Sequence, residues 1–224
     1  MANESANTGD SREVTIGEGS KKLHADLTMP EGDPHGMILF AHGSGSSRFS
    51  RRNREVAGFL VSRGMGTLLL DLLTEDEERE DVVTREHRFN IPMLAGRLVG
   101  AMDWMSEQDE LASFAVGLFG SSTGAGAALI AAAERPARAA AVVSRGGRPD
   151  LAGEALARVK APTLLIVGGE DTPVIGMNRD AASQMDCEVR TEIVPGATHL
   201  FEEPGKLEKV SELAADWFRE HFQK

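Results

Sequence analysis

Residues 114–129 read FAVGLFGSSTGAGAAL, and the predictions for the rest of the chain start from this stretch. It begins as an apolar run of strand length, turns at a cluster of small residues, and continues as an alanine-rich segment that favours helix. The turn carries the pattern Gly120-x-Ser122-x-Gly124. A serine on so tight a turn takes a strained backbone conformation, and the chain can pass only where the residues two positions away lack bulk. We therefore predict a strand, a sharp turn and a helix, with the Ser122 hydroxyl projecting from the end of a sheet.

The Gly-x-Ser-x-Gly pentapeptide is by itself weak evidence for a function, because glycine and serine are common residues. Its context strengthens the interpretation, since a strand before it and a helix after it are the setting of a nucleophile elbow. In that setting the amide of the next residue, Thr123, lies at a helix N-terminus. The alternative is an ordinary strand–helix turn whose small residues allow the helix to pack closely on the sheet.

The rest of the chain alternates between apolar runs of strand length and segments with helical periodicity. Continuous apolar runs are typical of strands that are buried on both faces of a parallel sheet. The N-terminal part differs, because residues 13–16 and 23–29 favour an antiparallel pair. We therefore predict an α/β fold with a doubly wound, mostly parallel sheet and an N-terminal antiparallel strand pair. Further strands are expected at 37–41, 67–70, 139–143, 162–167 and 188–194, and helices at 51–63, 89–105, 125–133, 153–159, 174–184 and 206–222.

The length and composition indicate one globular domain. The chain has 224 residues, of which 41% are hydrophobic, so it can bury a substantial core. Residues 1–12 are polar and lack the basic-then-apolar order of a signal peptide, so we expect a disordered leader followed by a single domain at 13–224. No apolar run reaches the ~20 residues that a transmembrane helix needs.

Charge and cysteine content exclude several classes of partner. The formal net charge is −11, which argues against nucleic acid or an anionic membrane as the main partner. The single cysteine, Cys187, allows no internal disulfide, so a reducing, cytoplasmic location is expected. The sequence has neither a CxxC motif nor a clustered His/Cys set, so we expect no metal site and no cofactor. The oligomeric state stays open, a homodimer included.

Residues that can carry chemistry gather in the loops that follow the predicted strands, where sites form in sheets of this kind. A serine is a poor nucleophile at neutral pH and needs a base that is itself oriented by a carboxylate. Ser122, Asp171 and His199 supply these three groups, in the chain order that α/β-hydrolases use. The loops concerned are 42–47, 120–124, 168–171 and 196–199.

Other histidines and carboxylates compete for the roles of base and orienting acid. His199 is favoured because it follows the carboxylate and precedes the final helix. Asp171 is favoured because two glycines before it let the chain turn its side chain toward a histidine. Asp150 is its strongest rival, since it follows the preceding strand, and His42 is expected to brace the loop that it begins. The remaining alternatives are His24, His35, His87, His221, Asp71 and Glu170.

Attack on a carbonyl builds negative charge on its oxygen, so two preorganised hydrogen-bond donors are required. The backbone N–H of Thr123, at the start of the predicted helix, is one candidate for this oxyanion hole. The second is the backbone N–H of Ser44 in the loop after the strand at 37–41, with Gly45 as the alternative. This loop lacks the lysine of a Walker motif, which argues against nucleotide binding.

Four stretches taken together resemble the α/β-hydrolase superfamily and, within it, the dienelactone hydrolase-like group. The resemblance implies the α/β-hydrolase fold and the triad named above. Dienelactone hydrolases proper use a cysteine nucleophile, whereas the elbow here carries Ser122, which points to a serine esterase-like enzyme. Similar domains are also found joined to phosphoribosyltransferase domains, and we expect no such domain in this chain. The stretches are AHGSGSS (41–47), FGSSTG (119–124), VGGED (167–171) and ATHLF (197–201).

The sequence therefore predicts a serine hydrolase that cleaves a small ester, lactone or thioester. Two alternatives are a non-catalytic ligand-binding protein with the same fold, and an acyltransferase that uses the same triad. Arg145 and His87 are candidate substrate-binding residues, Arg145 because arginine binds carboxylates and phosphates in a forked geometry. The acidic run at 75–81 is expected to be a solvated loop or exposed helical turn, with a mobile flap as the alternative.

Overall fold

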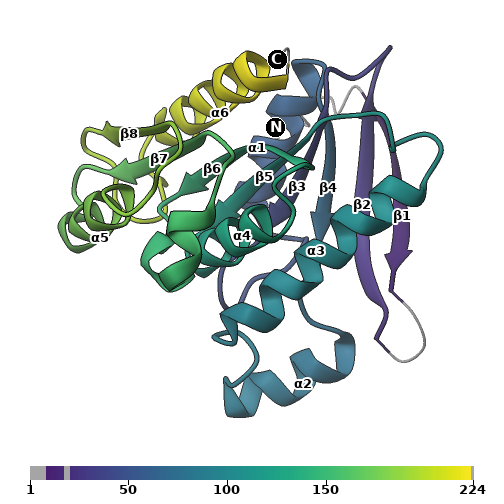
Figure 1. Ribbon diagram of the computed structural model, residues 1–224, viewed down its shortest axis with the longest axis horizontal. Coiled ribbons are helices and arrows are strands. Elements are labelled where there is room, and N and C mark those ends of the chain that lie inside the picture. Colours follow the sequence, from purple (N-terminus) through teal and green to yellow (C-terminus); the bar gives the residue numbers. More distant parts are fainter. Residues whose placement is uncertain (1–8, 18–20, 223–224) are drawn as a thin grey trace.

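The computed structural model describes residues 9–17 and 21–222 (Figure 1). Strands and helices alternate along most of the chain, as the sequence predicts. The strands are β1 (Gly9–Ile16), β2 (Leu23–Pro30), β3 (Met37–Ala41), β4 (Gly66–Leu70), β5 (Val116–Ser121), β6 (Ala139–Arg145), β7 (Thr163–Gly168) and β8 (Val189–Val194). The helices are α1 (Arg51–Ser62), α2 (Glu75–Thr84), α3 (Ile91–Glu107), α4 (Thr123–Glu134), the 3-10 helix η1 (Pro149–Arg158), α5 (Thr172–Ala182) and α6 (Lys206–Phe222).

The strands form one eight-stranded sheet in the order β1-β2-β4-β3-β5-β6-β7-β8. The strands from β4 to β8 pair in parallel, whereas β1 with β2 and β2 with β4 pair antiparallel. The expected doubly wound, mostly parallel sheet with an N-terminal antiparallel pair is confirmed. After β3 the chain continues to β4 on one side and later to β5 on the other, so the winding direction changes between β3 and β5. Ligand sites in open α/β sheets form at such a switch point.

The proposed leader at 1–12 is wrong in its last four residues. Residues 9–12 belong to β1, where they pair with the end of β2 from Gly9 opposite Pro30 to Arg12 opposite Leu27. The Arg12 side chain also forms an ion pair with Glu110, which follows α3. The strand was missed because its side chains are mostly exposed and polar, so it lacks an apolar alternation. Residues 1–8 lie outside the described part of the chain.

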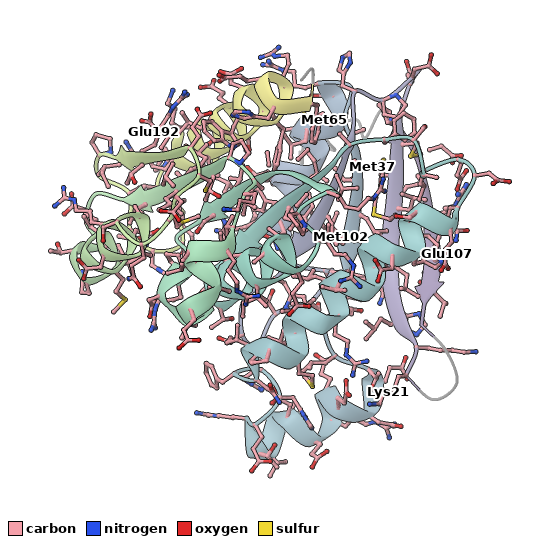
Figure 2. The ribbon with its side chains drawn as sticks, in the orientation of Figure 1. Lys21, Met37, Met65, Met102, Glu107 and Glu192 are labelled. Carbon is pink, nitrogen blue, oxygen red and sulfur yellow. The ribbon has the colours of Figure 1, made fainter. Side chains whose placement is uncertain are left out.

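Two helical layers cover the sheet, and alternate strand residues face each of them. On β3, Leu39 packs in the cluster beneath α3 and α4, whereas Phe40 packs in the cluster beneath α1 and α6 (Figure 1). Both faces of the central strands are therefore buried from solvent, which explains the continuous apolar runs in the sequence. Charged side chains such as Lys21 and Glu107 lie around the outside of the molecule (Figure 2).

The acidic run at 75–81 begins α2, an exposed helix. Thr74 caps it, because its side chain accepts from the Glu77 amide while the Glu77 carboxylate accepts from the Thr74 amide. Acidic residues in the first helical turn also suit the positive end of the helix dipole. The sequence prediction of an exposed helical turn is confirmed, and the helix extends to Thr84.

Gly124, in the first turn of α4, allows that helix to approach the end of β3 closely. A Cβ atom on Gly124 would lie 2.4 Å from the Ala41 carbonyl oxygen and 2.5 Å from that of His42.

We expect Gly124→Ala to lower the free energy of unfolding by ~1–3 kcal/mol through overpacking. A thermal melt should show a decrease in Tm of roughly 3–10 °C. Gly100→Ala on α3 is the matched control: nothing lies within 4 Å of its Cβ position, so helix propensity should raise Tm slightly. An unchanged Tm for Gly124→Ala would contradict this account of the turn.

Candidate active site

Ser122 occupies a strained turn between β5 and α4, at φ 51° and ψ −122°. Few non-glycine residues adopt a positive φ, and the conformation costs free energy. Neighbouring segments hold the turn: the Ser122 amide donates to the Arg145 carbonyl at 3.3 Å, and the Arg148 amide donates to the Ser122 carbonyl at 3.0 Å. A Cβ on Gly120 would lie 2.4 Å from the Ala125 Cα. Small residues on both sides of Ser122 are therefore a steric requirement of this turn.

His199 and Asp171 meet at the carboxyl edge of the sheet. Asp171 follows β7 and His199 follows β8, and the His199 Nδ1 lies 2.6 Å from the Asp171 Oδ2. Because a carboxylate only accepts, Nδ1 carries the ring proton and Nε2 is left as the basic nitrogen. The Asp171 side chain is 14% exposed and that of His199 is 37% exposed. The carboxylate thus lies beneath an imidazole that solvent can reach.

Close backbone contacts fix the loop that carries His199. A Cβ on Gly168 would lie 2.4 Å from the Ala197 carbonyl oxygen, so the ends of β7 and β8 pack against each other. The Thr198 amide donates to both carboxylate oxygens of Glu203, at 3.1 Å each. Hydrogen bonding from Thr198 holds the pKa of the Glu203 carboxyl below its usual value.

The segment Arg145–Gly146 lies between the serine and the histidine. Its Arg145 carbonyl accepts from Ser122, and a Cβ on Gly146 would lie 2.9 Å from the His199 carbonyl oxygen and 3.6 Å from its Nδ1. Gly146 has a φ of 49°, which a glycine adopts without strain. Ser122 and the His199–Asp171 pair therefore border the same short segment after β6.

The two residues expected to form the oxyanion hole, Ser44 and Thr123, are hydrogen-bonded to each other. The Ser44 amide donates to the Thr123 Oγ1 at 2.9 Å, so this N–H already has an acceptor. Thr123 is the first residue of α4, where an amide has no partner within its own helix. The loop also approaches the elbow closely, because a Cβ on Gly43 would lie 3.1 Å from the Ser122 Cβ. Gly45, the alternative, has its Cβ position 3.1 Å from the Arg88 Nη1.

His42 braces the loop that it begins, as the sequence predicts. Its Nε2 accepts from the Leu72 amide at 3.1 Å, and its Nδ1 lies 2.9 Å from the Gly43 carbonyl oxygen. An imidazole that accepts at one nitrogen and donates at the other is neutral. Burial lowers the pKa of His42, which favours the same neutral form.

The two candidate substrate-binding residues contact other side chains of the protein. Arg145 is 6% exposed, and its Nη2 lies 3.4 Å from the Asn53 Oδ1 beneath α1. His87 is half-buried, and its Nε2 lies 3.2 Å from the Glu80 Oε2 of α2. Asn53 was not predicted from the sequence. Its partners, Ser121 and Arg145, lie 68 and 92 residues further along the chain, and an asparagine in a helix carries no signal of such contacts.

The rival carboxylates are engaged elsewhere. Asp150 forms an ion pair with Arg148 at 2.7 Å, and Asp71 pairs with Arg48. Glu170 is exposed. Of the rival histidines, His24 lies 2.8 Å from Glu13, and the His221 ring packs against Trp217 on α6.

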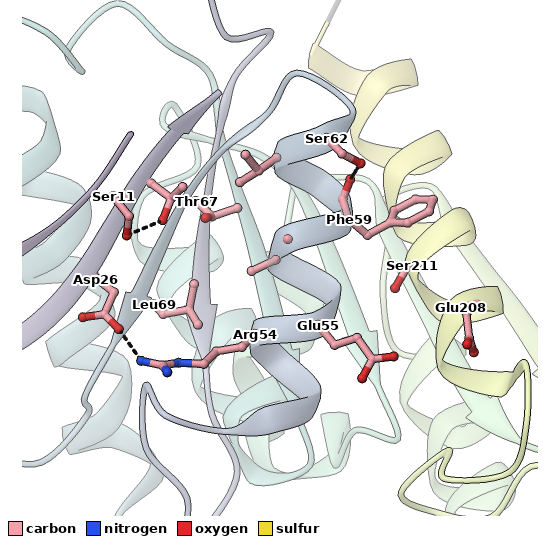
Figure 3. A pocket seen from close by; sticks show the side chains of 14 residues that line it. Ser11, Asp26, Arg54, Glu55, Phe59, Ser62, Thr67, Leu69, Glu208 and Ser211 are labelled. Carbon is pink, nitrogen blue, oxygen red and sulfur yellow. Dashed lines mark hydrogen bonds and ion pairs between the residues drawn. The ribbon is translucent and has the colours of Figure 1, made fainter. Parts of the chain in front are cut away.

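Two of the cavities among the described residues differ in their relation to the elbow. The larger, of about 560 Å³, lies on the α1 side between β1, β2, β4 and α6, and its lining includes Asp26, Arg54 and Thr67 (Figure 3). The smaller, of about 300 Å³, lies between the 42–46 loop and α2, with Arg88 in its wall. The smaller cavity adjoins the 42–46 loop of the candidate site, and Arg88 in its wall was not predicted from the sequence.

Two further features concern metals and membranes. Glu188, Glu220 and His221 bring potential metal-ligand atoms within 4.8 Å of one another, but the Arg190 guanidinium lies 3.9 Å from each glutamate. Within residues 9–17 and 21–222, no helix has the length and apolar character needed to cross a bilayer.

The model of the dienelactone hydrolase family matches residues 29–223. The chain belongs to the dienelactone hydrolase family. A crystal structure of dienelactone hydrolase from Anabaena variabilis ATCC 29413 has 55% identity and a TM-score of 0.93, covering 96% of this chain and 99% of that one. The α/β-hydrolase fold and the resemblance seen in the sequence are thereby confirmed.

This member of the dienelactone hydrolase family also resembles a more distant structure and two longer proteins. Est1E from Butyrivibrio proteoclasticus shares the fold at 16% identity, with a TM-score of 0.80 over 95% of this chain and 99% of that one. Two Mycobacterium tuberculosis proteins, from strains CDC 1551 / Oshkosh and H37Rv, are 53% identical over 93% of this chain. Each is named "Putative phosphoribosyl transferase", and the chain spans about half, 46%, of their length.

Proposed function

We propose that this hydrolase-family protein is a serine hydrolase that cleaves a small ester, lactone or thioester. The observation that carries the proposal is the 2.6 Å contact between His199 Nδ1 and Asp171 Oδ2 at the edge where Ser122 occupies its strained turn. A carboxylate on Nδ1 orients the imidazole and leaves Nε2 basic, as a serine nucleophile requires.

The proposed reaction has two symmetric halves. His199 Nε2 takes the Ser122 hydroxyl proton as Oγ attacks the carbonyl carbon. The resulting oxyanion collapses, the bond to the alcohol or thiol breaks, and the leaving group receives the proton from His199. Water then gives its proton to the same nitrogen and attacks the acyl carbon, which releases the acid and returns the proton to Ser122.

The oxyanion is proposed to bind the backbone N–H groups of Thr123 and Ser44. The Thr123 amide is available at the start of α4. The Ser44 amide exchanges its present acceptor, the Thr123 hydroxyl, for the oxyanion when charge develops. The stronger, charge-assisted hydrogen bond favours that exchange.

The alternatives are less well supported by the same residues. A protein that only binds a ligand needs neither a strained serine nor an imidazole oriented by a carboxylate, so these residues favour catalysis. An acyltransferase would use the same first half-reaction and a different acceptor from water. The phosphoribosyl transferase name of the longer relatives is proposed to belong to the part of those proteins that this chain does not match. A cytoplasmic location is proposed from the single cysteine.

Labelling with a fluorophosphonate tests the proposal directly. We expect intact-protein mass spectrometry to show addition of one phosphonyl group, and peptide mapping to place it on Ser122. The neighbouring Ser121, whose hydroxyl donates to Asn53 at 2.9 Å, is the internal control and should stay unlabelled. Denatured protein should not react, because activation depends on the folded His199–Asp171 pair. Folded protein that gains no mass, or gains it at another residue, would overturn the proposal.

A further inference from the structure

Arg145, which lies in the segment next to the Ser122 turn, buries a positive charge that has no carboxylate partner within residues 9–17 and 21–222. Arg145, the last residue of β6, is 6% exposed. Its Nη2 donates a hydrogen bond to the neutral Asn53 Oδ1 at 3.4 Å, and its Nε has no hydrogen-bond partner among the described residues. Burying a cation is costly unless it is paired, so this arrangement needs a reason.

The groups around Arg145 do not offset its charge. The charged side chain that acts on it is Arg52 of α1, which is repulsive and directs its own charge to Glu202 at 2.7 Å. Burial, followed by repulsion from Arg52, lowers the pKa of Arg145 to about 10. At neutral pH the guanidinium therefore still carries its proton.

The buried guanidinium shares a hydrogen-bond acceptor with Ser121, the residue next to Ser122 in the turn. The Arg145 carbonyl accepts from the Ser122 amide, and the side chains of Arg145 and Ser121 share the Asn53 Oδ1 as acceptor. Asn53 belongs to the first turn of α1, which contains no acidic residue. The positive end of that helix dipole therefore adds to the positive potential of the guanidinium. The chain has 35 acidic residues, yet its buried arginine here meets an amide.

We propose that Arg145 is kept without a counter-ion so that its charge stabilises the negative charge that develops on the substrate's carbonyl oxygen when Ser122 attacks it. The inference rests on the proposed serine mechanism. Arg145 does not touch the substrate or move a proton; it acts through the low-dielectric interior, where charges interact strongly over several ångströms. A carboxylate in the place of Asn53 would satisfy the same hydrogen bonds and cancel the effect.

Asn53→Asp separates this electrostatic role from a structural one. An aspartate has the same shape and can still accept from Ser121 and Arg145, so a purely structural network is kept or strengthened. We expect Tm to be unchanged or higher. The rate constant for fluorophosphonate labelling of Ser122, and kcat on p-nitrophenyl acetate, should fall roughly tenfold to a hundredfold, with KM nearly unchanged. Gln184→Glu, an exposed change after α5, adds the same charge at a distance and should leave both rates unchanged.

Replacement of the arginine itself supplies a second, independent measurement. Arg145→Lys keeps the charge and should retain most of the labelling rate, whereas Arg145→Met removes it and should lose at least as much as Asn53→Asp. If Asn53→Asp fails to fold, the comparison of Arg145→Lys with Arg145→Met still tests whether the charge of Arg145 speeds the reaction. Equal rates in Asn53→Asp and the wild type, or equal losses in the Lys and Met variants, would overturn the inference. A wild-type protein that is never labelled at Ser122 would instead overturn the proposed function.

Discussion

Ser122→Ala is expected to lower kcat on a short-chain p-nitrophenyl ester by ~10⁴-fold or more. The alanine cannot form the acyl-enzyme, and it leaves the His199–Asp171 contact of 2.6 Å in place. Because alanine and serine have similar backbone preferences, Tm should stay within about 2 °C of the wild type. Initial-rate measurements and a thermal melt on the same preparation check both statements.

Ser122→Gly extends this prediction to the strain in the turn. Its activity should be lost as in Ser122→Ala, but its Tm should rise, because glycine adopts φ 51° and ψ −122° without the ~1–3 kcal/mol cost borne by other residues. A stability gain together with a loss of activity is expected where function depends on a strained residue. Retained turnover in either variant would remove Ser122 from the mechanism.

Asp171→Asn should have the second-largest effect, a decrease in kcat of roughly 10³–10⁴-fold. An asparagine at this position can present its NH₂ group to His199 Nδ1, which favours the tautomer with the proton on Nε2. The imidazole then cannot take the Ser122 proton, although the distance and packing are preserved. Steady-state kinetics over a range of substrate concentrations should show the loss in kcat, with KM changed much less.

Asp150→Asn is the matched control, because Asp150 is the rival acid and pairs with Arg148 at 2.7 Å. Its side chain is about one-third exposed, so we expect kcat within about twofold of the wild type and a stability change below ~1 kcal/mol. A large loss in Asp150→Asn together with a small loss in Asp171→Asn would reverse the assignment of the acid.

Local signals in the sequence predicted which loops carry the candidate residues and that these loops meet at one edge of the sheet. Ser122 and Asp171 follow the buried strands β5 and β7, His199 follows the partly exposed strand β8, and parallel strands bring their carboxyl ends to one edge of the sheet. The Asp171–His199 contact follows from that topology and from the glycines that let the two loops approach.

What the sequence could not predict depends on side chains that meet from distant segments. The Ser44 amide finds the Thr123 hydroxyl across 79 residues, and Arg145 turns under α1 to Asn53. An arginine after a strand has the same pattern whether it points at a substrate or into the core. Residues 9–12 were missed for a different reason: their pairing comes from backbone hydrogen bonds with β2, which leave no trace in side-chain periodicity.

The exposed helix α2 is less tightly constrained by packing than the edge of the sheet that carries the candidate site. It buries little beyond Asp81, presents Val82 and Val83 to solvent at 68% and 82% exposure, and borders the cavity beside the 42–46 loop. Segments with so few buried contacts open locally at low free energy and tolerate replacement. Changes in this helix are therefore expected to disturb the fold little, whereas the glycine-lined edge of the sheet stays under tight steric constraint.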